Sequence, residues 1–379
     1  MTWERHAIDL AARITTPHSP WRPAVARTAR HLFVPRWWDR RARDQFDLRA
    51  PADNDEWFAD AYRDTSLVTK VGRLHADHAN AHDEPTGRPT SSATLPSLLL
   101  KLYGLADIGD GDTVVDVGAG SLYGAALLCR RLSDAQVLSV DVDPYLVEVG
   151  RERLAEVGLR PRVETVDATG PLPCDPDSID CIVASVAVRT VPQSWLTALR
   201  VGGRLVTTIA GTSLLITATK NADGGASGSV SWDRAGFMVA RHGDDYPPRR
   251  PKETITAQIQ EDAAKCVYPL PVVDVESAWD LQSMLDLAVP GIEHAYWEDD
   301  EGLRHALMSH ADGSWARAVG AGIHPPTVHQ GGPRRLWDAL EEVRGYWLQH
   351  GELPARGARV IVKPDGRTIL ARGQWTARL

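Results

Sequence analysis

The chain has 379 residues, 43% of them hydrophobic and 24% charged, which is the composition of an ordinary globular protein of one large or two smaller domains. Its formal net charge of -8 gives no basic excess, so we expect neither nucleic acid nor a membrane as a partner. The N-terminal segment is too charged for a signal peptide, and the four cysteines show no CxxC spacing. These features predict a cytoplasmic protein.

The sequence pattern of the first 241 residues changes at about residue 110. Residues 1–110 are predicted to be helical and loop-like, with a His-rich polar loop at 72–89. Residues 111–241 alternate short apolar runs with helical periodicity, which predicts a parallel sheet covered by helices on both faces. The expected strands of this sheet are 113–117, 137–141, 162–166, 179–185 and 204–209.

Local signals place further elements of this region. Asp143 and Pro144 are typical of an N-cap and a first helical residue, and Gly158 of the helix end. The runs 213–219 and 229–241 flank a turn and predict an antiparallel pair that closes the sheet edge.

The second half begins with a Pro-rich, charged linker at 242–254. Residues 255–379 form a predicted C-terminal extension of mixed α and β structure, with helical patterns at 275–288 and 334–350. A hairpin with a Pro-Asp-Gly turn ends the chain. We expect this extension to serve in substrate recognition or in subunit contact, and the oligomeric state stays open.

A glycine turn follows the strand at 113–117. Gly118 and Gly120 allow close approach of a ligand, and the next helix offers free N–H groups. Asp141 ends the second strand, where an acid can bind a ribose diol, and Asp167 ends the third, where it could meet an adenine amino group. A ligand is therefore expected at the carboxyl ends of the strands, although caps and turn formers would explain the same aspartates.

Two cofactor classes suit this layout. A dinucleotide prefers GxGxxG with no facing carboxylate, whereas here Asp116 adjoins the turn and Leu122 crowds the third glycine position. S-adenosyl-L-methionine carries an ammonium group for Asp116, directly or through water, and a carboxylate for the helix N-terminus. We therefore expect S-adenosyl-L-methionine.

Several sequence blocks together resemble the protein-L-isoaspartate O-methyltransferase family, from about residue 20 to 240. They include "RTARHLFVPR", "AYRDTSL", "SSATLPSLLLKLYGL", "VVDVGAGSLYGAALL", "VLSVDVDPYLVEVGRERL" and "DCIVASVAVRTVPQSWLTALRVGGRLVTTI". The resemblance implies a Rossmann-like, seven-stranded class I methyltransferase sheet and transfer of a methyl group to a side-chain carboxylate of a peptide or protein.

The same resemblance implies the site residues. Thr94 stands at the family's active-site serine, with Ser92 beside it as a second catalytic candidate; a helix N-cap is the alternative role of Thr94. Val188 and Arg189 are expected to meet the substrate, although an arginine in a loop is more often solvated. The expected cofactor contacts are Asp116, Gly118, Ala119, Gly120, Ser121, Tyr123, Asp141, Val142, Asp167 and Ala168.

The chain departs from the family at its turn, where Leu122 replaces a glycine, and in its added length. Its build is similar to the methyltransferases of ribosomally synthesised and modified peptides (RiPPs) such as lasso peptides and lanthipeptides. That similarity implies a threaded or cyclised peptide as partner, whose esterified aspartate closes to an aspartimide or opens to isoaspartate.

Other functions remain open at this stage. A repair enzyme for isoaspartate, a non-catalytic S-adenosylmethionine-binding protein and a dehydrogenase are the alternatives. His75, His78 and His82 have spacings that could suit zinc, but the loop lacks a cysteine partner and is polar, so we expect no metal.

Overall fold

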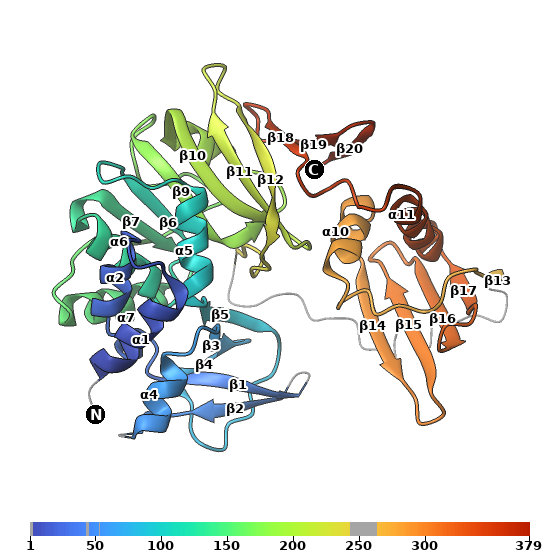
Figure 1. The fold of residues 1–379 in the computed structure, drawn as a ribbon, viewed down its shortest axis with the longest axis horizontal. Helices are drawn as coiled ribbons and strands as arrows, with labels where there is room; N and C mark the ends of the chain where they lie inside the picture. The colour runs from blue at the N-terminus through green and yellow to red at the C-terminus, as the bar shows by residue number, and fades with distance from the viewer. Residues whose placement is uncertain (1–2, 43–44, 53, 243–263) are drawn as a thin grey trace.

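A computed structural model describes residues 3–42, 45–52, 54–242 and 264–379 (Figure 1). Its main feature is a ten-stranded sheet with the order β20-β19-β18-β12-β11-β10-β9-β6-β7-β8. In the described part of the chain, no helix is both long and apolar enough to cross a membrane.

Five neighbouring strands of this sheet run parallel, as the sequence predicts. They are β6 (Val114–Val117), β7 (Val137–Asp141), β8 (Arg162–Thr165), β9 (Ile179–Val188) and β10 (Leu199–Ile209). All four residues of β6 are buried, which is typical of a central strand with helices on both faces.

The side chains of β6 alternate between two hydrophobic clusters. Val114 packs on one face with residues of α5 (Pro96–Leu105), α6 (Tyr123–Arg131) and α7 (Pro144–Glu156). Val115 packs on the other face with residues of α8 (Gln193–Ala198) and of the C-terminal part of the chain. The helix caps follow the prediction, since the Asp143 carboxylate accepts a hydrogen bond from the Tyr145 amide and Gly158 has a φ of 77°.

The remaining strands of the sheet are antiparallel. The predicted pair forms as β11 (Leu214–Lys220) and β12 (Ala226–Arg234), but it does not close the sheet. The terminal hairpin pairs with β12 and adds β18 (Arg359–Val362), β19 (Thr368–Arg372) and β20 (Trp375–Arg378). The expected number of seven strands is therefore too small, and the hairpin expected in the C-terminal extension belongs to the core sheet.

The N-terminal part is less helical than expected. It contains α1 (Trp3–Ile14), α2 (Arg22–Arg27), α3 (Arg30–Phe33) and α4 (Asp55–Ala61), but also a second, five-stranded sheet. Its strands are β1 (Trp37–Ala42), β2 (Gln45–Arg49), β3 (Leu67–Val71), β4 (Leu74–His75) and β5 (Pro89–Ala93). In β1 two buried tryptophans are followed by Asp39, Arg40 and Arg41, so charges on the solvated part of the β1–β2 hairpin hide the strand signal.

Part of the His-rich loop at 72–89 is folded. Residues 74–75 form β4, and the next three residues form a short 3₁₀ helix. His75 is 3% exposed, and its ring lies 5.0 Å from that of Tyr145 on α7. These contacts attach the loop to the core.

The C-terminal part holds a third sheet of five antiparallel strands, in the order β13-β17-β16-β15-β14. They are β13 (Ala264–Val267), β14 (Glu293–Glu298), β15 (Leu303–Ser309), β16 (Trp315–Ala321) and β17 (Thr327–Gly331). Two predicted helices form as α10 (Trp279–Ala288) and α11 (Leu336–His350) (Figure 1). The linker predicted at 242–254 lies, apart from His242, outside the described residues.

Leu122 has a left-handed backbone conformation at the start of α6, with a φ of 60°. This conformation costs a residue other than glycine about 1–2 kcal/mol. The Leu122 side chain is fully buried, and a Cβ atom added to Gly150 of α7 would lie 1.7 Å from its Cδ1 atom. The bare backbone of Gly150 thus makes the space that the leucine side chain occupies.

We therefore expect Leu122 and Gly150 to be energetically coupled. Gly150→Ala alone should destabilise the protein by about 1–3 kcal/mol through overpacking. In a Leu122→Gly background the same change should be neutral or stabilising, because alanine is the better helix former. Urea unfolding of the four proteins of this double-mutant cycle measures the coupling. Equal effects of Gly150→Ala in both backgrounds would contradict the packing argument.

Candidate active site

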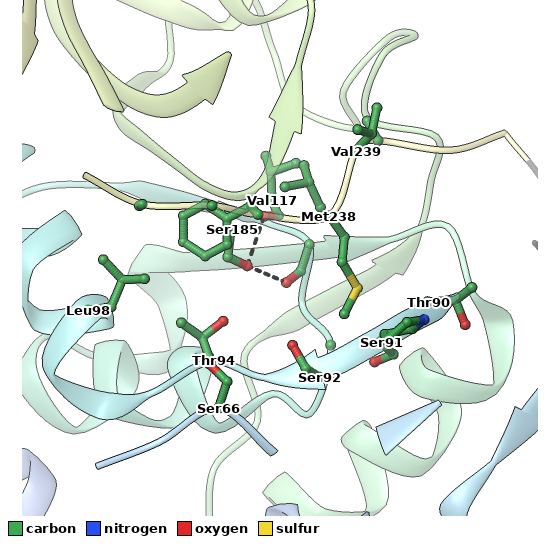
Figure 2. Close-up of a pocket in the computed structure, with 18 of the residues that line it drawn as sticks. Ser66, Thr90, Ser91, Ser92, Thr94, Leu98, Val117, Ser185, Met238 and Val239 are labelled. Carbon is green, nitrogen blue, oxygen red and sulfur yellow. Dashed lines mark hydrogen bonds between the residues drawn. The ribbon is translucent and has the colours of Figure 1, made fainter. Parts of the chain in front are cut away.

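A cavity of about 1290 Å³ lies at the carboxyl ends of the parallel strands. Its walls come from β5 and α5, from the ends of β6, β7, β8 and β9, from the segment 234–241 and from the start of α10. Figure 2 shows part of this cavity, with the hydroxyl groups of Ser92 and Thr94 on one wall and Ser185 and Met238 facing them.

The predicted glycine turn forms one edge of the cavity. Gly118 and Gly120 have φ values of 85° and 52°, a region that favours glycine. A Cβ atom at Gly118 would lie 2.6 Å from Val186 Cγ1, and one at Gly120 would lie 2.9 Å from the carbonyl oxygen of Ser92. Glycine is therefore needed here for two reasons, backbone conformation and space.

Asp141 ties this turn to the end of β7. Its Oδ2 atom accepts a hydrogen bond from the Gly120 amide at 2.9 Å, and its Oδ1 atom accepts one from the Asp143 amide at 3.0 Å. Burial raises the pKa of the Asp141 carboxyl, although the two amides favour the ionised form. Asp141 and its neighbour Val142 line the cavity, so the structure brings the expected ribose-binding acid to it.

Asp167 and Ala168 line the cavity at the end of β8. Burial acts to raise the pKa of Asp167, but hydrogen bonds from Thr169 and His242 outweigh it and lower that pKa. The His242 ring nitrogen lies 2.6 Å from the carboxylate. The Ala168 carbonyl accepts a hydrogen bond from the Trp195 indole at 2.7 Å, which fixes the backbone of this edge.

Thr94 lies just before α5, and its side chain does not cap that helix. The N-cap is Leu95, whose amide donates to the Ser66 hydroxyl at 3.1 Å, while the Ser97 amide donates to the Asp64 carboxylate at 2.9 Å. The Thr94 hydroxyl makes no hydrogen bond to another described residue, and both Thr94 and Ser92 line the cavity. The cap alternative for Thr94 is therefore wrong.

Several residues of the cavity escaped sequence reasoning. The Ser185 hydroxyl donates to the Gly118 carbonyl at 2.8 Å and so couples the end of β9 to the turn. Met238 lies on the segment after β12 (Figure 2). Its backbone carbonyl accepts a hydrogen bond from the Ala187 amide at 2.8 Å. Ser185 is the last residue of an expected strand, so its position at the cavity could have been predicted, whereas the path of residues 235–241 depends on tertiary contacts.

Four of the expected cofactor residues lie in the turn or directly beside it, but their side chains are outside the cavity lining. Asp116 accepts a hydrogen bond from the Ser139 hydroxyl at 2.7 Å, and burial raises its pKa to about 6. Ala119, Ser121 and Tyr123 are buried, and the Ser121 hydroxyl accepts from the Tyr123 amide at 3.3 Å. The structure therefore gives these residues a place in supporting the turn.

The expected substrate residues Val188 and Arg189 also lie outside the cavity lining. Val188 is buried in the core. The Arg189 guanidinium donates to the Asp286 carboxylate of α10 at 2.7 Å and to the Ala210 carbonyl at 3.4 Å. Arg189 thus joins the end of β9 to the C-terminal part, a contact that sequence spacing could not reveal.

A buried ion-pair network connects the two sides of the cavity. Lys70 of β3 lies 2.6 Å from the Asp143 carboxylate, and Arg241 lies 3.7 Å from the same group. These contacts lower the pKa of Asp143 against the opposing effect of its burial. Asp143 therefore links the N-terminal sheet, the start of α7 and the segment after β12.

The arrangement combines a turn that needs glycine, two carboxylates at strand ends and a hydroxyl-rich wall. Nothing in this set resembles a metal centre, and no group of three or more His, Cys, Asp or Glu residues able to hold a metal occurs in the described ranges. The geometry suits a polar ligand along the strand ends and a second ligand against Thr94.

A family model and several relatives point to one family, and a ubiquinone/menaquinone biosynthesis C-methyltransferase of Enterobacter sp. is also 29% identical over 165 residues. The family model "Protein-L-isoaspartate(D-aspartate) O-methyltransferase (PCMT)" matches residues 74–233. A protein-L-isoaspartate O-methyltransferase of Leptothrix cholodnii is 30% identical over 206 residues, which cover 53% of this chain and 60% of the relative. One of Thermococcus onnurineus is 30% identical over 126 residues and is covered over 57% of its length. The chain thus matches less than two thirds of the length of these two relatives.

Solved structures give weaker similarities. A protein-L-isoaspartate O-methyltransferase aligns over 100% of this chain and 99% of its own, at 15% identity and a TM-score of 0.49. A Plasmodium falciparum protein in complex with S-adenosyl-L-homocysteine aligns over 64% of this chain and 100% of its own, at 12% identity and a TM-score of 0.43.

A Pseudomonas paraeruginosa protein-L-isoaspartate O-methyltransferase is covered more fully. It is 31% identical over 195 residues, which span 49% of this chain and 71% of that protein. Together with the glycine turn, the acids at the strand ends and the Thr94 hydroxyl, this match shows that the chain belongs to the protein-L-isoaspartate O-methyltransferase family.

Proposed function

We propose that the protein is an S-adenosyl-L-methionine-dependent O-methyltransferase that esterifies a side-chain carboxylate of a peptide or protein. The observation that carries this proposal is the Thr94 hydroxyl, which faces the cavity beside the glycine turn with no hydrogen bond to a described residue. Family membership supports the same reaction class.

The residues present fit the cofactor. Gly118 and Gly120 leave the backbone bare where a ligand approaches, and Asp141 offers carboxylate oxygens to a ribose diol. Asp167, held by Thr169 and His242, is suited to accept from an adenine amino group, with Val142 and Ala168 beside it. When bound, S-adenosyl-L-methionine supplies a methyl group on a positively charged sulfur.

The acceptor needs little activation. An aspartyl or isoaspartyl carboxylate has a pKa near 4 in water, so it is ionised at neutral pH and no general base is required. The protein therefore acts by alignment and by exclusion of water. Thr94 donates a hydrogen bond to one carboxylate oxygen and so directs the other toward the methyl group, with the Ser92 hydroxyl as a neighbouring donor.

We further propose that the acceptor is an ordinary aspartate in a constrained ribosomal peptide, threaded or cyclised. The wall that the C-terminal part adds to the cavity supports a specialised substrate. After methyl transfer, the next backbone amide nitrogen attacks the ester carbonyl, a C–N bond forms, and methanol leaves, which yields an aspartimide. A five-membered ring closes readily because the reacting groups belong to one chain.

A second candidate is repair of isoaspartyl residues in damaged proteins. Membership of the protein-L-isoaspartate O-methyltransferase family favours it, and the cavity fits its carboxylate equally well. In this case the C-terminal part would serve another purpose than substrate choice.

Mass spectrometry after incubation with S-adenosyl-L-methionine separates these candidates. We expect a constrained Asp-containing peptide to gain one methyl group and then to lose methanol, and a linear isoaspartyl peptide to remain unchanged. Turnover of the linear peptide alone would favour repair. Cofactor binding without methyl transfer to either peptide would contradict both and favour a non-catalytic protein.

The role of Thr94 is tested by Thr94→Val, which keeps the side-chain shape and removes the hydroxyl. Loss of one hydrogen-bond donor to the charged, reacting carboxylate should lower kcat about 10- to 100-fold. Thr94→Ser should retain most activity. Because Thr94 does not cap α5, the melting temperature of both variants should equal that of the wild type. An unchanged kcat for Thr94→Val would remove Thr94 from the reaction.

The cofactor assignment is tested by Asp141→Asn. The amide cannot accept from both backbone N–H groups and from a ribose, so we expect S-adenosyl-L-homocysteine to bind about 10- to 100-fold more weakly by calorimetry. Asp175→Asn, an exposed aspartate outside the cavity, is the matched control and should bind normally. Equal affinity of the two variants would exclude Asp141 from the cofactor site.

A further inference from the structure

One side of α5 forms a path along the cavity. Leu98 and Lys101 line it three residues apart, so they lie on one face of the helix, and Thr94, just before the helix, lines the same cavity. The path leads from the candidate catalytic hydroxyl toward the C-terminal part.

Near the end of this path lies Arg234, a cation that packs on the ring of Trp279. The Lys101 ammonium lies 2.6 Å from the Asp233 carboxylate, which neutralises that acid. The next residue, Arg234, places its guanidinium 5.2 Å from the ring centre of Trp279 on α10. Arg234 and Trp279 both line the cavity, and Arg234 makes no ion pair with a described residue.

A buried arginine from the C-terminal part holds this wall in place. Arg356 is 6% exposed and donates to the Asp233 carbonyl at 2.7 Å. The same guanidinium donates to the Asp280 carboxylate of α10 at 2.8 Å and to the Ser213 hydroxyl at 2.9 Å. Arg356 thus fixes the end of β12, which carries Arg234, against the start of α10, which carries Trp279.

The charge of the cavity favours an acidic ligand on this wall. Two of the three carboxylates that line the cavity, Asp141 and Asp167, stand at its cofactor end, and the third, Glu276, lies on the C-terminal wall. The lining cations are Arg40, Arg88, Lys101, Arg234 and Arg241. Arg88, Lys101 and Arg241 pair with carboxylates outside the lining, whereas Arg234 has no such partner among the described residues. A guanidinium can bind a carboxylate through two parallel hydrogen bonds, and a ring below it restricts its motion.

We propose that Arg234, supported by Trp279 and positioned by Arg356, is a specificity-determining residue that binds a second carboxylate of the peptide acceptor. This inference rests on the proposed function. Because Thr94 and Arg234 line the same cavity, the acceptor is a peptide with an acidic residue a few positions from the methylated one.

The test compares peptides that differ in one side chain. Each peptide is made in a cyclised and in a linear form, carries one Asp-Gly or isoaspartyl-Gly unit, and has Glu or Gln at two, three or four positions before or after it. Calorimetry measures their binding to the full-length protein with S-adenosyl-L-homocysteine. At one of these positions, Glu should improve affinity about tenfold over Gln.

Variants assign that preference to a residue. Arg234→Gln should bind the Glu and Gln peptides equally, and Arg234→Glu should prefer a Lys peptide at the same position. Arg317→Gln is the matched control, because Arg317 of β16 also lacks an ion pair to a described residue and lies outside the cavity lining. It should keep the preference of the wild type.

The outcomes separate this inference from the proposed function. Equal affinity for all peptides in the wild type, or an unchanged preference in Arg234→Gln, would overturn the subsite even if the peptides are methylated. A preference that depends on Arg234, with no methyl gain by mass spectrometry, would support the subsite and contradict the proposed function. Absence of any peptide binding would overturn the subsite.

Discussion

The site depends on one half-buried carboxylate. Asp141 accepts hydrogen bonds from the amides of Gly120 and Asp143, so it holds the glycine turn and the start of α7 in a fixed relation at the end of β7. A backbone N–H group that is buried without a hydrogen-bond acceptor lowers the stability of the folded protein, and in this turn Asp141 is the acceptor. The shape of the cavity edge therefore follows from an acid that the sequence led us to expect at a ligand, with a role as cap or turn former as the alternative.

The turn also shows how a departure from a family pattern is accommodated. A leucine at position 122 adopts a left-handed conformation that glycine would adopt without cost. Its side chain is buried against Gly150, a glycine inside a helix, where this residue is otherwise unfavourable. Leucine is unfavourable in a left-handed conformation, and glycine is unfavourable inside a helix. The pair is compatible because Gly150 has no side chain and so leaves the space that the Leu122 side chain fills.

Much of the core was predictable because its signals are local. The five parallel strands, the Asp143 cap and the carboxyl-end acids follow from periodicity and from residue types that favour one backbone state. The N-terminal sheet was not, because its hairpin strands carry charges on their solvated face. Arg189 was assigned to substrate because it follows β9, yet its partner Asp286 lies 97 residues away in the chain. Contacts at that separation leave no pattern in a single sequence.

The return of the terminal hairpin to the core sheet constrains how the protein is made. Strand β12 has an unpaired hydrogen-bonding edge until residues 359–362 are synthesised and reach it. More than a hundred residues, including the whole C-terminal sheet, are translated between the two partners. During that interval the edge of β12 is unpaired and exposed to aggregation. A chain truncated before residue 359 would keep this edge without its partner strand.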